Sequence, residues 1–226
     1  MNYFNKIEEH IKSLEFNVVS KDFNRPWGGF LVIDETQAQE FSNHFFDGLV
    51  KHRKLKNIEL GRKSVEEAQA ATKTPLIIVL DNIRSLNNIG SVFRTSDAFL
   101  LQKIYLCGIT AQPPHKDIQK TALGATESVA WTYVENTLDL VIKLKQEGVA
   151  VWSIEQAEQA VFLNNFQPEP KQTHAFVLGN EVKGVAQEVI DASHGVIEIP
   201  QEGAKHSLNI AVTAGVVAWD FFQKIQ

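Results

Sequence analysis

The chain has 226 residues, of which 44% are hydrophobic and 22% are charged. This composition is typical of a globular protein and excludes a disordered chain, and the length allows one full domain with an appendage. The single cysteine, Cys107, excludes an internal disulfide framework and a cysteine-rich zinc site. Because no apolar stretch reaches the length of a membrane span and residues 1–20 lack the apolar segment of a signal peptide, we expect a cytoplasmic protein without a membrane partner.

The net charge of -5 is spread unevenly along the chain. Residues 1–50 hold four basic and eight acidic side chains, whereas residues 51–64 hold six basic and one acidic. A basic run of this kind either contacts phosphate groups or forms a solvated surface, and charge alone does not decide between the two. The basic residues of this run are Lys51, Arg53, Lys54, Lys56, Arg62 and Lys63.

The first 50 residues form an appendage with a pattern of their own. They are too few to bury a core alone, so the segment must dock on the remainder, pair with another copy or move. Residues 22–35, DFNRPWGGFLVIDE, resemble the opening of a cupin-type sugar-phosphate isomerase. No metal-binding His-x-His follows, so the resemblance implies no activity. We expect residues 51–73 to be a basic linker or helical segment and residues 74–226 to form the main domain.

From Thr74 onward, short apolar runs alternate with helical patterns. Continuous β-branched and aromatic runs bounded by turn residues predict strands that are covered on both faces, at 75–80, 103–108, 129–134, 149–154, 174–179 and 195–200. Helices are predicted between and after them, at 88–100, 117–124, 137–147, 184–192 and 207–224. The alternation indicates an α/β fold whose mostly parallel sheet has helices on both faces. In such sheets ligands bind at the carboxyl ends of the strands, so the loops at 81–88, 179–184 and 200–207 are the candidates for the chemistry.

The common cofactor and catalytic motifs are missing from these loops. No G-x-G-x-x-G follows the first predicted strand, and GNEVKGV at 179–185 lacks the Lys-Ser/Thr of a phosphate-binding loop. There is no G-x-S-x-G motif, and the seven histidines show no spacing typical of a metal site. His206 is more simply a solvated or capping residue than a catalytic base. We therefore expect no metal and neither a dinucleotide nor a nucleoside triphosphate.

Three junctions between a strand and a helix hold unusual polar residues. In the first, Asn88 stands where a helix N-cap is expected, and Arg94 either pairs with Asp97 on the helix surface or faces a ligand. In the second, LGNEVKG at 178–184, glycines flank a polar pair that forms either a tight turn or part of a site.

The third junction lies at the start of the last helix. Ser207 is expected to cap this helix, and Asn209 is expected one turn into its apolar run. A carboxamide at such a position needs a hydrogen-bonding partner.

Taken together, the three junctions resemble the SpoU-type (TrmH-like) RNA 2'-O-ribose methyltransferases of the SPOUT superfamily. The matching stretches are NNIGSVFRTSDAF, FVLGNEVKGV and IEIPQEGAKHSLNIAVTAGV, in the order of the family, and the resemblance covers about residues 51–226. It implies a C-terminal trefoil knot, which periodicity does not predict and which general topology rules disfavour. It also implies a homodimer that forms through the knot region.

The resemblance implies that S-adenosylmethionine binds in the knot loops. Such loops expose backbone groups that can read an adenine edge without charged side chains. The residues that match are Leu178, Gly179, Asn180, Glu181, Gly184, Ile199, Pro200, Ser207 and Leu208.

The resemblance also implies five catalytic residues for methyl transfer to a ribose 2'-hydroxyl of tRNA or rRNA. Arg94 matches the family's catalytic arginine; because a guanidinium stays protonated, we expect it to bind phosphate and stabilise the developing alkoxide rather than act as a simple base. Asn88, Ser207 and Asn209 are expected to orient the ribose and the arginine, and Glu181 is expected to hold the loop or the arginine.

Two alternatives to an active enzyme remain open at the level of sequence. One is a non-catalytic RNA-binding module that keeps the fold, although such a module has no need for all five catalytic residues. The other is a sugar-handling protein defined by its first 50 residues, which the missing metal ligands disfavour. The target nucleotide, and the choice between tRNA and rRNA, do not follow from the sequence.

Overall fold

The computed structural model describes residue 61, residues 63–204 and residues 207–226, and the chain divides into two units, residues 1–62 and 63–226. The second unit contains every element described below. The predicted appendage and most of the basic run, including Lys51, Arg53, Lys54, Lys56 and Arg62, lie outside the described residues. The same is true of the stretch that resembles a sugar-phosphate isomerase, so the domain boundaries stay a prediction.

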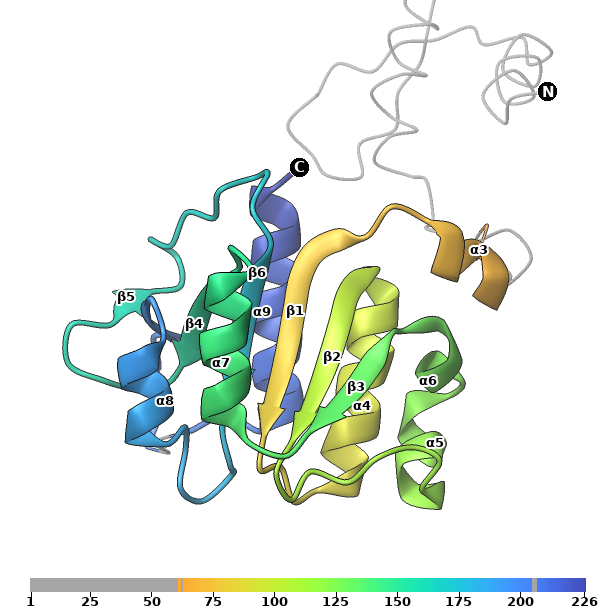
Figure 1. Ribbon diagram of the computed structural model, residues 1–226, viewed down its shortest axis with the longest axis horizontal. Helices are drawn as coiled ribbons and strands as arrows, with labels where there is room; N and C mark the ends of the chain where they lie inside the picture. The colour runs from red at the N-terminus through yellow and green to blue at the C-terminus, as the bar shows by residue number, and fades with distance from the viewer. Residues whose placement is uncertain (1–60, 62, 205–206) are drawn as a thin grey trace, which may run out of the picture. The chain divides into compact units, whose positions relative to one another are not determined.

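Seven strands form one parallel sheet (Figure 1). Their order across the sheet is β3-β2-β1-β6-β4-β7-β5. The strands are β1 (Thr74–Asp81), β2 (Leu101–Cys107), β3 (Trp131–Val134), β4 (Ala150–Ile154), β5 (Val161–Phe162), β6 (His174–Leu178) and β7 (Gly195–Glu198). The α/β class and the parallel sheet predicted from the sequence are therefore confirmed.

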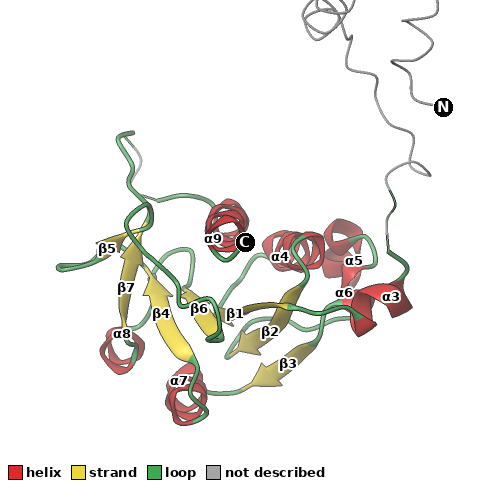
Figure 2. Ribbon diagram, turned by 90° about the horizontal axis from the view of Figure 1, so that it is seen from above, coloured by secondary structure: helices red, strands yellow, loops and turns green. Residues whose placement is uncertain are grey.

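Helices cover both faces of the sheet (Figure 2). On one face lie α4 (Leu86–Ala98), α5 (Lys116–Ala122), α6 (Ala125–Ser128) and α9 (Ile210–Lys224), and on the other lie α7 (Thr137–Gln146) and α8 (Gln187–Ala192). A short helix, α3 (Val65–Ala70), precedes β1, and the Gln69 side chain donates a hydrogen bond to the carbonyl of Glu127 in α6.

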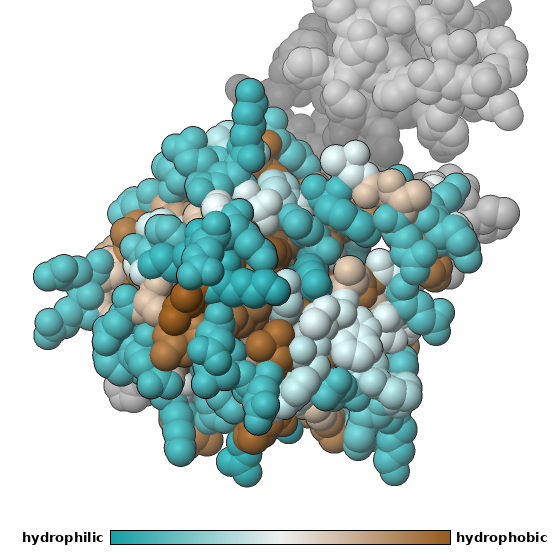
Figure 3. Space-filling view, in the orientation of Figure 1, coloured by the Kyte–Doolittle hydropathy of each residue, from teal (hydrophilic) through white to brown (hydrophobic). Residues whose placement is uncertain are grey.

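The alternation of side chains along β1 explains the two layers of core. Leu76, Ile78 and Leu80 point into the cluster with α4 and α9, whereas Ile77 and Val79 point into the cluster with α7 and α8. All five are buried, which is why this strand reads as a continuous apolar run rather than an alternating one. The face over α7 and α8 shows mainly hydrophilic side chains to solvent (Figure 3).

The prediction from the sequence missed two elements, placed two helix starts too early and placed one too late, since the helix predicted from residue 88 begins at Leu86. The strand β5 has only two residues, both exposed, so it carries no apolar run, and the four-residue helix α6 is too short for a helical period. The helix predicted from residue 184 begins at Gln187, and the helix predicted from residue 207 begins at Ile210. In both places the chain first forms a loop at the carboxyl edge of the sheet.

Candidate active site

The carboxyl ends of β4, β6 and β7 border a cavity of about 600 Å³. Ligands bind at this edge in open parallel sheets, and the volume lies in the range of small-molecule sites. Of the nine predicted cofactor residues, seven line the cavity: Gly179, Asn180, Glu181, Gly184, Ile199, Ser207 and Leu208.

Two of the nine do not line the cavity. Leu178 is the last residue of β6, and its side chain is fully buried in the core. Only its backbone is therefore available to a ligand. Pro200 is exposed and is not among the residues that line the cavity.

A tight hairpin at residues 180–184 forms one wall of the cavity. The Asn180 and Gly184 backbones exchange hydrogen bonds of 3.1 and 2.8 Å, and Oδ1 of Asn180 accepts from the backbone N–H groups of Val182 and Lys183. The Asn180 Nδ2 also donates to the carbonyl of Asn82, just beyond β1, at 2.7 Å. The hairpin is thus closed on itself and fixed to the neighbouring strand.

Two glycines make this hairpin possible. Gly184 has a φ of +67°, a left-handed conformation that side chains disfavour. A Cβ on Gly179 would lie 2.2 Å from the backbone nitrogen of Val185, far closer than atoms can approach. The hairpin backbone is therefore tightly packed, and both glycines line the cavity.

A chain of hydrogen bonds joins the three junctions at the mouth of the cavity. The Glu181 carboxylate accepts from the backbone N–H groups of Arg84 and Ser85, each at 3.1 Å, and from Nδ2 of Asn88 at 3.5 Å. Oδ1 of Asn88 accepts from Nδ2 of Asn209 at 3.2 Å. Three residues predicted to be catalytic, from three separate loops, are therefore in contact.

The environment of Glu181 favours its charged form. Partial burial raises the pKa of this carboxyl, but the hydrogen bonds from the backbone of Arg84, from the Glu181 and Ser85 backbones and from Asn88 outweigh it, so the net pKa is lowered. The carboxylate also lies at the N-terminus of α4, where the helix dipole stabilises negative charge. Glu181 is thus an anion that fixes the loop before α4.

The two asparagines occupy other helix positions than predicted. Ser85, not Asn88, is the N-cap of α4: its side chain accepts from the backbone N–H of Asn88, which lies in the first turn. Asn209, not Ser207, is the N-cap of α9, and its Oδ1 accepts from the backbone N–H of Ala211 at 2.9 Å. Ser207 lies in the loop before the helix, exposed and facing the cavity. The Asn209 carboxamide thus has two hydrogen-bonding partners, the backbone N–H of Ala211 and Oδ1 of Asn88.

Arg94 lies apart from this cluster. It is exposed and borders a second cavity, of about 610 Å³, between α4, α5 and α9. Because an α-helix turns by about 100° per residue, a spacing of six places Arg94 and Asn88 on different faces of α4. The alternative pairing of Arg94 with Asp97 is also absent from the ion pairs of the described residues, and the Asp97 carboxylate accepts from the Ser128 hydroxyl instead.

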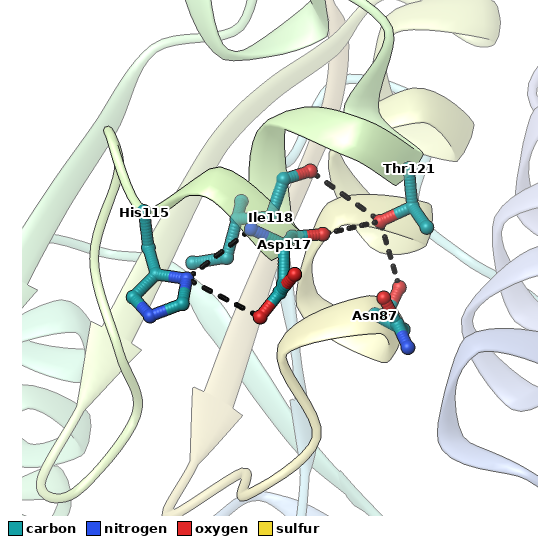
Figure 4. Close-up of polar contacts among 5 residues, drawn as sticks. All are labelled: Asn87, His115, Asp117, Ile118 and Thr121. Atoms are coloured by element: carbon teal, nitrogen blue, oxygen red, sulfur yellow. Dashed lines mark hydrogen bonds and ion pairs between the residues drawn. The ribbon is translucent and has the colours of Figure 1, made fainter.

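Thr121 fixes the wall of the second cavity (Figure 4). Its hydroxyl lies within 3.4 Å of three carbonyl oxygens, those of Asn87, Asp117 and Ile118, so it joins α5 to the first turn of α4. At the start of α5, the His115 ring accepts from the backbone N–H of Asp117 as a helix cap. Lys120 adds a second cation to the wall that contains Arg94.

Sequence reasoning missed Glu155 and Gln156, which also line the first cavity. They directly follow β4, and their position after a strand was the available signal. No motif marked this loop, so it was not among the three loops considered.

The sequence model of the SpoU rRNA Methylase family matches residues 75–219, which span all three junctions. The chain belongs to this family. The predicted family and an RNA methylase as the class of enzyme are therefore confirmed.

Curated and solved proteins agree with this assignment. The 23S rRNA (guanosine-2'-O-)-methyltransferase RlmB of Vibrio parahaemolyticus is 26% identical over 179 residues, which cover 79% of this chain and 70% of that protein. The A. aeolicus TrmH/SpoU tRNA modifying enzyme superposes with a TM-score of 0.63 at 22% identity, covering 71% of this chain and 80% of that one. An AdoMet-bound rRNA methyltransferase from Sinorhizobium meliloti superposes with a TM-score of 0.63 at 24% identity, covering 69% and 58%.

The similarity to these solved SpoU structures supports the knotted C-terminal fold that the sequence resemblance implied. In this SpoU-family chain the segments concerned are the hairpin after β6 and the loop between β7 and α9, which both border the first cavity. Among the described helices, none is long and apolar enough to cross a membrane.

Proposed function

We propose that this SpoU-family methyltransferase transfers the methyl group of S-adenosylmethionine to a ribose 2'-hydroxyl of rRNA or tRNA. The observation that carries the proposal is the contact of Glu181, Asn88 and Asn209 at the mouth of a ligand-sized cavity. The family match and the names of the relatives, which include rRNA and tRNA enzymes, support this substrate class.

The first cavity fits S-adenosylmethionine as the methyl donor. Gly179 and Gly184 line its wall, where the close backbone packing has no room for a Cβ, and apolar side chains of Ile154, Ile199 and Leu208 add faces for a flat ring. When bound, this cofactor supplies an electrophilic methyl group on a sulfonium centre. The residues of the chain hold the acceptor ribose against it.

In this proposal Asn88 and Asn209 orient the ribose. Their amides are fixed by each other, by Glu181 and by the α9 cap, so they present donors and acceptors without a loss of rotamer freedom on binding. Ser207 adds a hydroxyl on the same wall. Most of the rate enhancement then comes from holding the oxygen and the methyl group in line.

We further propose that the enzyme is a homodimer and that Arg94 acts across the dimer. Arg94 borders a cavity separate from the cofactor cavity of its own chain, and the neighbouring surface of α9 exposes Val212 (52%), Val216 (36%) and Trp219 (52%). An apolar helix face of this kind suits a two-fold interface, in which the same surface is used by both copies.

The role of Arg94 in this dimer is to bind the phosphate next to the target ribose and to stabilise the negative charge that develops on the 2'-oxygen. A guanidinium is suited to both tasks because it stays protonated and binds oxyanions in a bidentate manner. Lys63, the one member of the basic run inside the second unit, is exposed and available to phosphate. We propose that it binds the RNA backbone, the role that the sequence predicts for the whole basic run.

The test uses the full chain with S-adenosylmethionine labelled in the methyl group and with unmodified tRNA and rRNA. After digestion, wild type is expected to yield a labelled 2'-O-methyl nucleoside, whereas Arg94→Ala and Arg94→Lys lose most turnover but keep cofactor affinity. Lys143→Ala, an exposed cation on α7 at the opposite face of the sheet, is the matched control and should match wild type. Cofactor binding without transfer to either RNA would instead favour a non-catalytic RNA-binding module.

A further inference from the structure

Glu155 is an acidic side chain in the cofactor cavity that the proposed reaction leaves without a role. It directly follows β4 and is half-buried among the residues that line the cavity. β4 lies between β6 and β7, so Glu155 is separated from the Asn88 loop by the hairpin after β6. The reacting end of the cavity and Glu155 are therefore on opposite sides of that hairpin.

The carboxylate of Glu155 is held by backbone groups on both oxygens. Oε2 accepts from the N–H of Val185 and Oε1 accepts from the N–H of Gln156, each at 3.0 Å. The Glu155 backbone N–H donates to the carbonyl of Ile197 at 3.1 Å. A Cβ on Gly184 would lie 2.3 Å from Oε2, so the glycine leaves the space that the carboxylate occupies. The side chain thus has a fixed position.

This fixed carboxylate still has acceptor capacity. A carboxylate accepts about four hydrogen bonds, and Glu155 accepts two from the protein. Its charge is not balanced by an ion pair within residues 63–204 and 207–226. A partly buried anion is costly unless its lone pairs are satisfied, and two neighbouring hydroxyl groups would satisfy them without bringing a second charge.

We propose that Glu155 binds the 2'- and 3'-hydroxyls of the ribose in the adenosine part of the cofactor. The proposal rests on the proposed function, since it assigns S-adenosylmethionine to this cavity. Ile154 precedes Glu155 directly and Ile199 follows β7, the strand paired with β4, and both line the cavity beside the carboxylate. These apolar side chains suit the faces of an adenine ring, and the ribose joined to that ring then lies at Glu155.

The experiment measures binding rather than turnover, with S-adenosylhomocysteine and its 2'-deoxy and 3'-deoxy analogues as ligands for the full chain. In wild type, removal of either hydroxyl is expected to weaken binding at least about tenfold, because a hydrogen bond to a charged group is lost. In Glu155→Gln this penalty should shrink to about threefold or less for both analogues, since the charge is gone. Glu158→Gln, an exposed carboxylate nearby on the same loop, should keep the wild-type penalties.

The comparison separates a ligand-binding role from a purely structural one. If Glu155 only holds the hairpin, Glu155→Gln weakens all three ligands by the same factor and leaves the penalties unchanged, which overturns the proposal. Wild type alone also decides: equal affinity for the three ligands overturns it even if the variant does not fold. Tight binding of S-adenosylhomocysteine with equal analogue affinities leaves the proposed methyltransferase in place, whereas no binding of any ligand overturns both.

Discussion

Asn209, the N-cap of α9, donates a hydrogen bond from its Nδ2 to Oδ1 of Asn88 in the first turn of α4, at 3.2 Å. The same amide accepts from the backbone N–H of Ala211 with its oxygen. One side chain therefore has two tasks, since it starts the C-terminal helix and it holds the amide that faces Glu181. The folding role and the proposed catalytic role meet in a single carboxamide.

The two tasks of Asn209 can be separated by substitution. Asn209→Ala removes both, and the lost cap is expected to cost about 1 kcal/mol, or about 2–4 °C in Tm for a chain of this length. Asn209→Asp keeps an acceptor for the Ala211 N–H but has no donor for Asn88. We therefore expect Asn209→Asp to unfold within about 1 °C of wild type while the rate of methyl transfer falls at least about tenfold.

Thermal unfolding and initial rates with labelled cofactor check this separation. Gln223→Ala, at an exposed position near the end of α9, provides a reference for minor perturbation of the same helix. Full activity of Asn209→Asp would contradict the orienting role, and a large loss of stability would contradict the assignment of the oxygen as the cap.

Gly184→Ala should damage the cofactor cavity as well as the fold. The left-handed φ of +67° disfavours any side chain, and the new methyl group would lie 2.3 Å from Oε2 of Glu155. We expect a loss of about 1–3 kcal/mol in the free energy of unfolding and at least about tenfold weaker binding of S-adenosylhomocysteine. Urea unfolding and calorimetric titration measure the two effects.

Gly203→Ala is the matched control for that substitution. A Cβ at Gly203 meets no heavy atom within 4 Å among the described residues, and its φ is not in the left-handed range. Its unfolding free energy and cofactor affinity should therefore stay close to those of wild type. Equal effects of the two substitutions would show that backbone conformation at Gly184 does not shape the cavity.

The central strands of the sheet could be predicted from the sequence because burial on both faces gives an unbroken run of apolar residues. Ile77 and Val79 pack against one helical layer while Ile78 and Leu80 pack against the other, so none of these four positions in β1 faces solvent. β5 carries no such signal, since Val161 and Phe162 are exposed. Short edge elements of this kind are set by tertiary pairing rather than by local pattern.

The candidate site could be predicted from the sequence only in part. Ser and Asn are about equally good N-caps, so the sequence could not decide between Ser207 and Asn209; the contact with Asn88 across 121 residues of chain favours the latter. Arg94 was identified from its motif, but a motif does not state which cavity a helical residue faces. Glu155 was missed because its neighbours in space, Val185 and Gly184, are about 30 residues away.

Stability at acid pH should depend on Glu181. Its pKa in the folded state is lowered from the ordinary value of 4.5, so its stabilising contribution is present above pH 4.5 and is lost as the pH falls through the lower folded pKa. Glu181→Gln should therefore be less stable than wild type at pH 7, and the difference should shrink as the pH is lowered below about 4.5.

Urea unfolding of both proteins at several values between pH 7 and pH 3 measures this difference. Glu158→Gln, at an exposed surface position, serves as the control and should differ little from wild type across the range. A difference between wild type and Glu181→Gln that grows toward acid pH would contradict the hydrogen-bonded carboxylate seen at the start of α4.

The exposed face of α9 predicts how the enzyme loses activity when it is forced to be a monomer. Trp219 is 52% exposed and lies against Phe222 and Phe99, with ring centroids 6.4 and 5.9 Å apart. A charge introduced there by Trp219→Glu should dissociate the proposed dimer, because burying an unpaired carboxylate in an interface is costly. Sedimentation should then give a monomer that binds S-adenosylhomocysteine normally yet transfers at most about 1% as much methyl, since Arg94 no longer reaches the cofactor cavity of the partner subunit. Ile142→Glu on α7, where the side chain is 44% exposed on the opposite face, should keep both the dimer and the activity. A fully active monomer of Trp219→Glu would contradict this prediction and would show that Arg94 acts within its own chain.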